Sequence, residues 1–418
     1  MIEKQYDTVI IGGGAAGMAA ALRCEQKGLK VVIVEREDFL GGILMQCIHN
    51  GFGLHRFSEE LTGPEYAEKF SEEVYRSTVE VYLETTVINI ENNGKEKIVS
   101  ACSQKHGVMI FKTESIILAM GCRERNRGNI GIPGARTSGI LTAGLAQRLL
   151  NIDGFIPGQQ IVIIGSGDIG LIMARRLSWV GCKVICVVEI MPQPSGLTRN
   201  VVQCLDDFDI PLHLSHAVCQ INGKDRIESV DIAPIENGIL MNDKSFNIEC
   251  DTLLMSVGLI PENELSLKAD IKLNPDTKGP FVDADMMSNV DGIFACGNVL
   301  HVHDLVDFVS EEADRCADSV VDFLQSKEDS PSEQIPVSAG THIKYVVPNK
   351  LTINKSNKFL MRAMITKDVA ELQVKSNDEI IVKRKLKNIK PAEMIDLSLN
   401  DAEIAKLADK NHIEIGLI

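Results

Sequence analysis

The chain of 418 residues is 44% hydrophobic and 24% charged, which is the composition of an ordinary globular protein. Its length predicts two or three domains and leaves ample material for a large core. Because 58 acidic side chains outnumber 43 basic ones, the net charge at pH 7 is −15. That balance argues against broad binding to nucleic acids or to anionic membranes.

The eleven cysteines are scattered through predicted helices and strands, and nothing in the sequence indicates secretion. The apolar start at Thr8 is patterned as a strand and not as the core of a signal peptide. No apolar run reaches the roughly 18 residues of a membrane-spanning helix. We therefore expect reduced, buried thiols, no membrane insertion and a cytoplasmic location.

A dinucleotide-binding pattern opens the chain. Residues 8–11 are a short β-branched run that predicts a buried strand, and a turn of glycines leads into an Ala-rich helix. The turn fits G-x-G-x-x-G, in which Gly12 makes the tight turn, Gly14 lets the backbone approach a pyrophosphate, and Gly17 lets helix and strand pack closely. The N–H groups at the start of the helix then face the phosphates.

An acid follows at the distance typical of this pattern. The strand over 30–35 ends in Glu35, 23 residues after Gly12, where a carboxylate binds a ribose diol. The connection over 36–53 then contains four glycines, which favours backbone that lies close to a ligand.

The same pattern occurs a second time. Residues 160–170 repeat the strand and the glycine spacing, and the strand over 183–189 again ends in an acid. Two dinucleotides in one chain imply electron or hydride transfer between them. The second acid, Glu189, is followed by Ile190 and Met191 rather than by arginines. Since a carboxylate suits a free 2′-hydroxyl and repels a 2′-phosphate, NAD(H) is favoured over NADP(H).

Further strands and helices are predicted along the rest of the chain. Buried strands that run into a glycine are predicted over 115–121, 251–258 and 290–298. Alternating strands are predicted over 79–83, 86–91, 97–104 and 108–112, with a hairpin turn at 92–94. Helices are predicted over 58–78 and about 304–325, and Asp304 is expected to cap the second of them. After a linker over 326–338, strands over 343–347, 359–365, 370–374 and 379–384 and a helix over 400–410 predict a small antiparallel sheet domain.

The order of these motifs resembles the two-dinucleotide-binding-domain flavoproteins of the pyridine nucleotide–disulfide oxidoreductase superfamily. Segments 119–121 and 256–258 resemble its two crossover strands, and 295–298 resembles its closing FAD motif. The resemblance covers about residues 6–325 and implies FAD in the first unit and NAD(P)H in the second, inserted unit. Asn298 stands where an aspartate is usual, and it still offers a hydrogen bond to a hydroxyl but no charge.

This resemblance implies an α/β fold with two Rossmann-like three-layer ββα domains and a small β-rich C-terminal domain. We expect an FAD-binding domain over 1–150 and 251–328, an NAD(H)-binding domain over 151–250, and a C-terminal domain over 339–418 that makes subunit contacts. The residues expected to contact the cofactors are Gly12, Gly14, Ala15, Ala16, Gly17, Glu35, Arg36, Gly42, Val87, Ala119, Gly121, Gly165, Gly167, Asp168, Ile169, Gly170, Glu189, Gly258, Gly297 and Asn298.

Segments 41–54, 121–129 and 296–304 are similar to a narrower branch of the superfamily. Its members are found alongside glycerol-3-phosphate dehydrogenase flavoproteins and among the NAD-linked subunits of opine, proline and sarcosine-type oxidase complexes. That resemblance implies one subunit of a homo- or hetero-oligomeric, multi-flavin assembly. The implied partners are a second flavoprotein dehydrogenase subunit, which oxidises the substrate, and a cysteine-rich redox module that holds metal or iron–sulfur centres.

The redox disulfide of the superfamily is missing from the sequence. Counted from the glycine pair at 41–42, the positions of its C-x-x-x-x-C motif hold Leu44 and His49, and no C-x-x-C occurs in the chain. The glutamate that flanks the flavin in the disulfide reductases is replaced by Ile172. We therefore do not expect a dithiol–disulfide reductase.

Two residues of the flavin-facing loop are candidates for catalysis. Cys47 is the one thiol of that loop, and it either cycles through sulfenic acid, as in some NADH oxidases and peroxidases, or packs as an inert thiol. His49 either donates to the flavin or caps loop carbonyls. Similarly, Asp168 either gates the nicotinamide pocket or is a plain acid at a helix N-terminus.

Two histidine pairs, His301 with His303 and His213 with His216, have the spacing of metal ligands. Because no cysteine or acid in the sequence completes either site, we expect loop histidines and no metal. The predicted function is that of an FAD-dependent NAD(H) oxidoreductase that passes hydride between nicotinamide and flavin without a protein relay. The alternative is a stand-alone NADH oxidase or peroxidase that uses Cys47.

Overall fold

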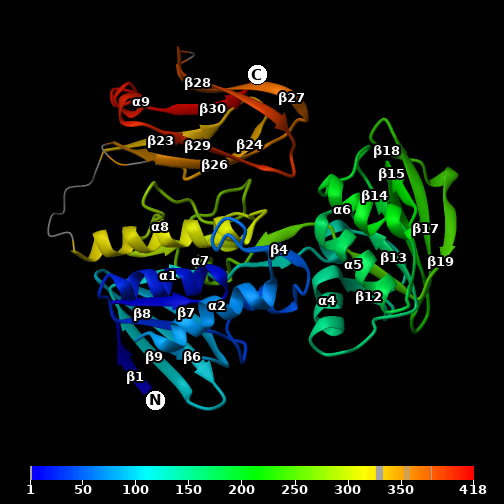
Figure 1. Cartoon of the computed structure of the whole chain (residues 1–418), viewed down its shortest axis with the longest axis horizontal. Coiled ribbons are helices and arrows are strands. Elements are labelled where there is room, and N and C mark those ends of the chain that lie inside the picture. Colours follow the sequence, from blue (N-terminus) through cyan, green and yellow to red (C-terminus); the bar gives the residue numbers. More distant parts are fainter. Residues whose placement is uncertain (1, 326–332, 354, 356, 378) are drawn as a thin grey trace. The chain divides into compact units, whose positions relative to one another are not determined.

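The computed structural model describes residues 2–325, 333–353, 355, 357–377 and 379–418. The chain divides into two compact units, one that combines residues 1–122 with 261–418 and one that contains residues 123–260 (Figure 1). Among the described residues, no helix is long and apolar enough to cross a membrane.

A parallel sheet of five strands forms the centre of the first unit. Its order is β22 (Ile293–Ala295), β10 (Ser115–Leu118), β2 (Thr8–Ile11), β3 (Val31–Val34) and β6 (Glu80–Tyr82). Every residue of the first four of these strands is buried. Such strands read as continuous apolar runs because both faces of the sheet are covered.

A helical layer and a second sheet cover the two faces of this parallel sheet. Helix α1 (Ala15–Gln26) packs on β2 and β3 and against α8 (Val306–Gln325). The second sheet has the order β1 (Ile2–Gln5), β9 (Gly107–Thr113), β8 (Glu96–Ser103) and β7 (Thr85–Asn93), and β7, β8 and β9 contact β3, β10 and β2. The predicted three-layer architecture is thereby confirmed, and β7 and β8 form the predicted hairpin, with Gly94 at φ +77°.

Helix α2 (Gly63–Arg76) begins five residues after its predicted start at 58. The Thr62 side chain accepts a hydrogen bond from the Glu65 backbone, and the Glu65 carboxylate accepts one from the Thr62 backbone at 2.7 Å. This capping box, together with Pro64 in the first turn, determines where the helix starts. The preceding residues form a short strand pair, β4 (Asn50–Phe52) with β5 (Leu61–Thr62).

The second unit contains another parallel sheet of five strands. Its order is β12 (Ile140–Thr142), β20 (Thr252–Met255), β13 (Gln160–Ile164), β14 (Lys183–Glu189) and β15 (Leu212–Leu214), with helices α4 (Ala143–Asn151) and α5 (Asp168–Trp179). An antiparallel sheet of β16 (His216–Gly223), β17 (Ile227–Glu236), β18 (Ile239–Leu240) and β19 (Phe246–Glu249) completes it. Because β12 and β20 belong to this parallel sheet, the unit covers residues 123–260 and extends beyond both ends of the predicted NAD(H) segment at 151–250.

The C-terminal residues form a β-rich domain, as predicted, but with two sheets rather than one antiparallel sheet. One has the order β25 (Lys350–Thr352), β23 (Gln334–Ala339), β30 (Ile413–Leu417), β27 (Lys367–Ser376) and β28 (Glu379–Ile389), and its β23–β30 pair is parallel. The other contains β24 (Ile343–Val347), β26 (Asn357–Ala363) and β29 (Met394–Leu399), and a short helix α9 (Asp401–Ala405) follows. The predicted linker over 326–338 lies partly outside the described residues, and its last residues, 334–338, belong to β23.

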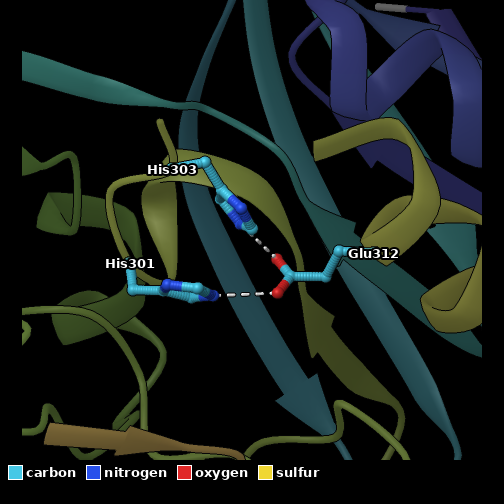
Figure 2. A group of neighbouring side chains, drawn as sticks. All are labelled: His301, His303 and Glu312. Carbon is cyan, nitrogen blue, oxygen red and sulfur yellow. Dashed lines mark hydrogen bonds and ion pairs between the residues drawn. The ribbon is translucent and has the colours of Figure 1, made fainter. Parts of the chain in front are cut away.

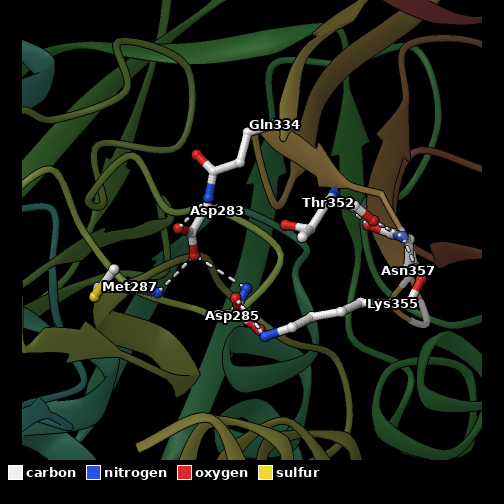
Figure 3. A network of polar contacts seen from close by, with 7 residues as sticks. All are labelled: Asp283, Asp285, Met287, Gln334, Thr352, Lys355 and Asn357. Carbon is white, nitrogen blue, oxygen red and sulfur yellow. Dashed lines mark hydrogen bonds and ion pairs between the residues drawn. The ribbon is translucent and has the colours of Figure 1, made fainter. Parts of the chain in front are cut away.

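Ion pairs and hydrogen bonds attach the C-terminal domain to the rest of the first unit (Figure 3). Gln334 donates to the Asp283 carboxylate at 2.8 Å, and the Lys355 ammonium lies 2.8 and 2.9 Å from the two carboxylate oxygens of Asp285. Tyr345 and Val347 are buried in the same apolar core as the central parallel sheet. The C-terminal domain therefore stabilises the segment that carries β22 and α8.

The prediction that Asp304 caps the long helix is wrong. Helix α8 begins at Val306, and both carboxylate oxygens of Asp304 bind residues of the C-terminal domain. One pairs with the Arg362 guanidinium, and the other accepts the Met394 backbone N–H at 2.7 Å. A charged partner distant in the sequence replaces the local cap because an ionised donor makes the stronger hydrogen bond.

Candidate functional site

The first glycine turn is packed too closely for side chains. A Cβ on Gly12, whose φ is +105°, would lie 2.5 Å from the Ala119 carbonyl oxygen, and a Cβ on Gly17 would lie 1.9 Å from the Gly12 carbonyl oxygen. These contacts join the end of β2, the start of α1 and the end of β10. Two of the three predicted motif glycines are thus required by the fold itself.

Gly14, by contrast, has open space beside it. No atom lies within 4 Å of a Cβ built on this residue, and no side chain caps the N-terminus of α1. The first turn of α1 therefore offers uncapped backbone N–H groups and the positive end of the helix dipole to a group in that space. Those are the properties that bind a pyrophosphate, so the residues present fit the predicted FAD site.

Glu35 is held beside the same turn. Its carboxylate is buried, with only 6% of the residue exposed, and it accepts hydrogen bonds from the backbone of Gly13 at 2.6 Å and of Glu37 at 2.9 Å. Arg36, in contrast, is exposed, with its guanidinium 3.9 Å from Glu37. The structure brings the predicted ribose-binding acid to the glycine turn, and its role in binding stays a prediction.

The second glycine turn repeats these contacts one for one. A Cβ on Gly165 would lie 2.0 Å from the Ser256 carbonyl oxygen, and the Ser166 backbone donates to the Glu189 carboxylate at 3.0 Å. Gly167 precedes α5 without a side-chain cap, and only one atom, 3.9 Å away, lies near its Cβ position. The residues present therefore fit a second dinucleotide.

Glu189 differs from Glu35 in how many donors surround it. Besides the Ser166 amide, its carboxylate accepts from the Ser166 hydroxyl at 2.5 Å, the Ser195 hydroxyl at 2.9 Å and the Met191 amide at 3.0 Å. Three of these four donors share Oε2, and only the Met191 amide binds Oε1, so Oε2 is fully occupied and Oε1 is not.

Asp168 holds the segment that follows β14. One of its carboxylate oxygens accepts from the Leu197 backbone at 2.9 Å and from the Asn200 side chain at 2.7 Å. This anchors the start of α6 (Thr198–Cys204) to the start of α5. Asp168 was expected either to gate the nicotinamide pocket or to be a plain acid at a helix N-terminus. Its contacts add a third role, which is to fix a loop beside the glycine turn.

The predicted closing motif at Gly297 and Asn298 is held by side chains of its own unit. Gly297 donates its backbone N–H to Glu312 at 2.7 Å. The Asn298 side-chain oxygen Oδ1 accepts a hydrogen bond from the His303 backbone N–H at 3.0 Å. The side-chain nitrogen Nδ2 of Asn298 lies 3.7 Å from the Cys122 sulfur. Contacts within the protein therefore hold this turn in place without a cofactor.

Asp307 was missed by the sequence reasoning. It is buried in the first turn of α8 and accepts from the backbone of Gly53 at 3.1 Å and of Arg56 at 2.8 Å. The four-glycine connection is thereby attached to the start of the long helix. The only local signal was an acid in the first turn of a helix, which does not identify its partners.

Cys47 and His49 lie in the predicted loop, after the short helix η1 (Gly42–Gln46). The Cys47 thiol donates to the Ile43 carbonyl at 3.3 Å, and burial raises its pKa to about 12. The Nδ1 of His49 lies 3.1 Å from the Asn50 carbonyl oxygen, and its ring packs 5.1 Å from that of Phe52. Because the thiolate is the reactive form, this environment favours a packed thiol over a redox cysteine.

The other predicted contact residues take the positions that the motifs imply, either within an element or directly beside one. Ala15, Ala16, Ile169 and Gly170 lie in the first turns of α1 and α5; Val87 is half-buried in β7; Ala119 and Gly121 follow β10; Gly258 follows β20; Gly42 opens η1. Their contact with a cofactor stays a prediction.

The structure corrects the expectation that no acid accompanies His301 and His303. Glu312, in the second turn of α8, lies between them, 2.9 Å from Nε2 of His301 and 3.2 Å from Nε2 of His303 (Figure 2). His213 and His216 instead pack against each other and against Phe246, with ring centroids 5.6 to 6.1 Å apart. Among the described residues, only the first pair joins a third metal-ligating side chain.

Two uncapped helix N-termini, each beside a glycine turn and a buried acid, are the geometry of dinucleotide-binding turns. The family model described as pyridine nucleotide-disulphide oxidoreductase matches residues 6–317. The chain belongs to this family, whose members use FAD and NAD(P)H. The predicted superfamily is thereby confirmed.

Individual relatives are similar to this chain at low sequence identity. One of the opine oxidase subunits of Agrobacterium tumefaciens (strain Ach5) is 24% identical over 321 residues, which cover 70% of this chain and 61% of that protein. Hydrogen cyanide synthase subunit HcnB of Pseudomonas protegens is 26% identical over 288 residues, which cover 64% and 59%. The chain thus spans about three fifths of the length of these relatives.

Thioredoxin reductases are similar over nearly their whole length. That of Treponema pallidum is 26% identical over 304 residues, which cover 71% of this chain and 90% of that protein. The crystal structure of T. acidophilum thioredoxin reductase superposes with a TM-score of 0.64 at 22% identity, covering 77% of this chain and 99% of that one. The latter similarity confirms the fold.

We predict that Gly14→Ala folds but loses FAD. Its φ of −76° and ψ of −169° suit alanine, and the added methyl group enters open space where a pyrophosphate would lie. Flavin absorbance per chain should fall by about tenfold or more, with an unchanged melting temperature. In Gly17→Ala the methyl group meets the Gly12 carbonyl, so this contrasting variant should lose about 2 kcal/mol or more of stability. A Gly14→Ala protein with full flavin content would contradict the site.

Proposed function

We propose that the chain is an FAD-dependent NAD(H) oxidoreductase that passes hydride between nicotinamide and flavin. The observation that carries this proposal is the repeated turn. Gly13 and Ser166 each donate a backbone N–H to the acid that ends the neighbouring strand, and Gly14 and Gly167 each precede an uncapped helix. Two dinucleotide sites in one chain of this family support transfer between two redox cofactors.

FAD is assigned to the first turn and NAD(H) to the second. Bound there, the flavin would supply the group that exchanges hydride with nicotinamide. The start of α1 would hold one pyrophosphate and the start of α5 the other, while Glu35 and Glu189 would bind the ribose hydroxyls. The choice of NAD over NADP rests on the buried Glu189 carboxylate, since a 2′-phosphate would bring a second negative charge beside it.

Electrons would not pass through a protein disulfide. None of the eleven cysteines, all of which lie in the described residues, forms a disulfide, and none belongs to a C-x-x-C pair. Thioredoxin reductases are among the relatives, yet in this chain Leu44 and His49 stand at the positions of the redox cysteine pair of the disulfide reductases. The flavin itself would therefore deliver or receive the electrons.

We further propose that the chain works as an electron-transfer component of a larger complex. Two relatives, from opine oxidase and from hydrogen cyanide synthase, are named as subunits of those enzymes. The complex would be of the glycerol-3-phosphate or amine/imino-acid dehydrogenase type. Its other parts would be a cysteine-rich redox module and a second flavoprotein dehydrogenase subunit, with the C-terminal domain of this chain providing contacts between subunits.

NADH should reduce the flavin of the purified chain under anaerobic conditions. The absorbance near about 450 nm, typical of oxidised flavin, should bleach faster with NADH than with NADPH. Glu189→Gln should narrow that preference by about tenfold, equivalent to about 1.4 kcal/mol, because the repulsion of the 2′-phosphate is lost. Glu236→Gln, at an exposed acid of the same unit, is the control and should leave the preference unchanged. If NADH fails to bleach the flavin, the proposed function is wrong.

Cys47→Ser should leave NADH turnover within about twofold of wild type, because the half-buried thiol, whose pKa is raised to about 12, stays protonated at neutral pH. The raised pKa also predicts slow alkylation by iodoacetamide between about pH 7 and 9, compared with the exposed Cys102. A stand-alone NADH oxidase or peroxidase that uses Cys47 predicts the opposite result, namely loss of turnover in Cys47→Ser with normal flavin content.

Native purification from the source cells should yield the chain with a second flavin-containing subunit. The purified material should contain more than one flavin per copy of this chain, and it should also contain iron. The reason is that a companion dehydrogenase and a cysteine-rich module would each bring a cofactor. Recovery of the chain alone, with one flavin and no iron, would overturn the assignment to a complex and leave the NADH reaction standing.

A further inference from the structure

The cluster of His301, His303 and Glu312 is closed to solvent. The exposed fractions of these side chains are 0%, 1% and 1%. The two histidines follow the short helix η4 (Gly297–Val299), and Glu312 lies in α8, so the cluster joins a loop to a helix (Figure 2). Its residues are not among those assigned above to either cofactor.

Glu312 is a buried carboxylate that has no lysine or arginine partner among the described residues. Its partners are the Gly297 backbone N–H and the two imidazoles, and no lysine or arginine of the described residues forms an ion pair with it. A buried negative charge calls for a cation beside it.

The four donor atoms of the cluster are arranged as metal ligands. Nε2 of His301 lies 2.9 Å from one carboxylate oxygen of Glu312, and Nε2 of His303 lies 3.2 Å from the other. One ligand atom from each residue can be chosen so that all three lie within 4.8 Å of one another. Ligands at zinc stand roughly 3.3–3.6 Å apart, so a small opening of the cluster accommodates the ion.

The type of donor selects the metal. Two imidazoles and a carboxylate suit a divalent transition ion, zinc first, rather than the all-oxygen ligands of calcium or magnesium. The Gly297 N–H, 2.7 Å from Glu312, orients the carboxylate as outer-shell donors do in metal sites. Nδ1 of His301 has no hydrogen-bond partner among the described residues and would carry the ring proton when Nε2 binds the ion.

We propose that His301, His303 and Glu312 form a binding site for one divalent transition metal ion, of which zinc fits best. Nε2 of each histidine and the carboxylate of Glu312, which offers both oxygens, are the ligands. Each neutral imidazole moves its proton from Nε2 to Nδ1, so that no redox step and no further reactant is involved. The ion fixes the 297–303 loop to α8 and is structural, since no side of the cluster is open to substrate.

The test measures metal in the full-length, flavin-containing protein grown with added zinc and desalted. Plasma mass spectrometry should find about one zinc per wild-type chain. His303→Gln and Glu312→Gln should retain below about a tenth of an equivalent. Glu311→Gln is the matched control, because Glu311 is the neighbouring acid on α8, is half-exposed and pairs with Lys358. It should keep the full equivalent.

Cobalt provides a second measurement that needs only the wild-type protein. Growth with Co²⁺ in place of zinc should give visible absorption bands from a tetrahedral N/O site, in addition to the flavin spectrum. Wild-type protein without stoichiometric metal and without cobalt bands would overturn the proposal and leave a hydrogen-bonded triad. Metal retained equally in folded His303→Gln and Glu312→Gln would also overturn it. Neither result depends on reduction by NADH, so the proposed function is tested separately.

Discussion

The close approach of a helix to the end of a strand is the constraint on which both units depend. At Gly17 a Cβ would lie 1.9 Å from the Gly12 carbonyl oxygen, and at Gly170 it would lie 2.8 Å from that of Gly165. This packing brings the start of each helix to the carboxyl end of a parallel strand. The helix amides there lack side-chain caps, so an anionic group satisfies them and the helix dipole together. The fold and the binding of a pyrophosphate thus require the same glycines.

Features that rest on neighbouring residues could be predicted from the sequence. The glycine turns, the buried strands and the hairpin at Gly94 each have a local signal, and all of them occur in the structure. The sheet of β16 to β19 was not predicted because its strands lack clean alternation, and β19 has three exposed residues out of four. The parallel pairing of β23 with β30 joins residues about 75 positions apart, which no local pattern specifies.

The side-chain partners within the site could not be predicted for the same reason. Asp304 has the sequence signal of a helix cap, yet Arg362 binds it from another domain. Glu312 reads as one of several acids on α8, and only the packing of that helix over the loop brings it between His301 and His303. Residue type and spacing therefore identified the two histidines of this cluster, and tertiary packing supplied the acid.

The two acids at the glycine turns differ in a way that bears on which nucleotide is resident. Glu35 accepts two hydrogen bonds, both from backbone amides, so about two of its four lone-pair positions remain for ribose hydroxyls. Glu189 accepts four, two of them from the hydroxyls of Ser166 and Ser195.

A ribose diol can therefore bind both oxygens of Glu35 without displacing any protein contact. At Glu189 one ribose hydroxyl can bind Oε1, but a second must replace a serine hydroxyl on Oε2. The first arrangement favours a nucleotide that stays bound, because the acid is preorganised for it. The second favours one that exchanges, since the serines restore the hydrogen bonds of the acid when the ribose leaves. This difference matches the proposed assignment of a resident FAD to the first turn and an exchanging NAD(H) to the second.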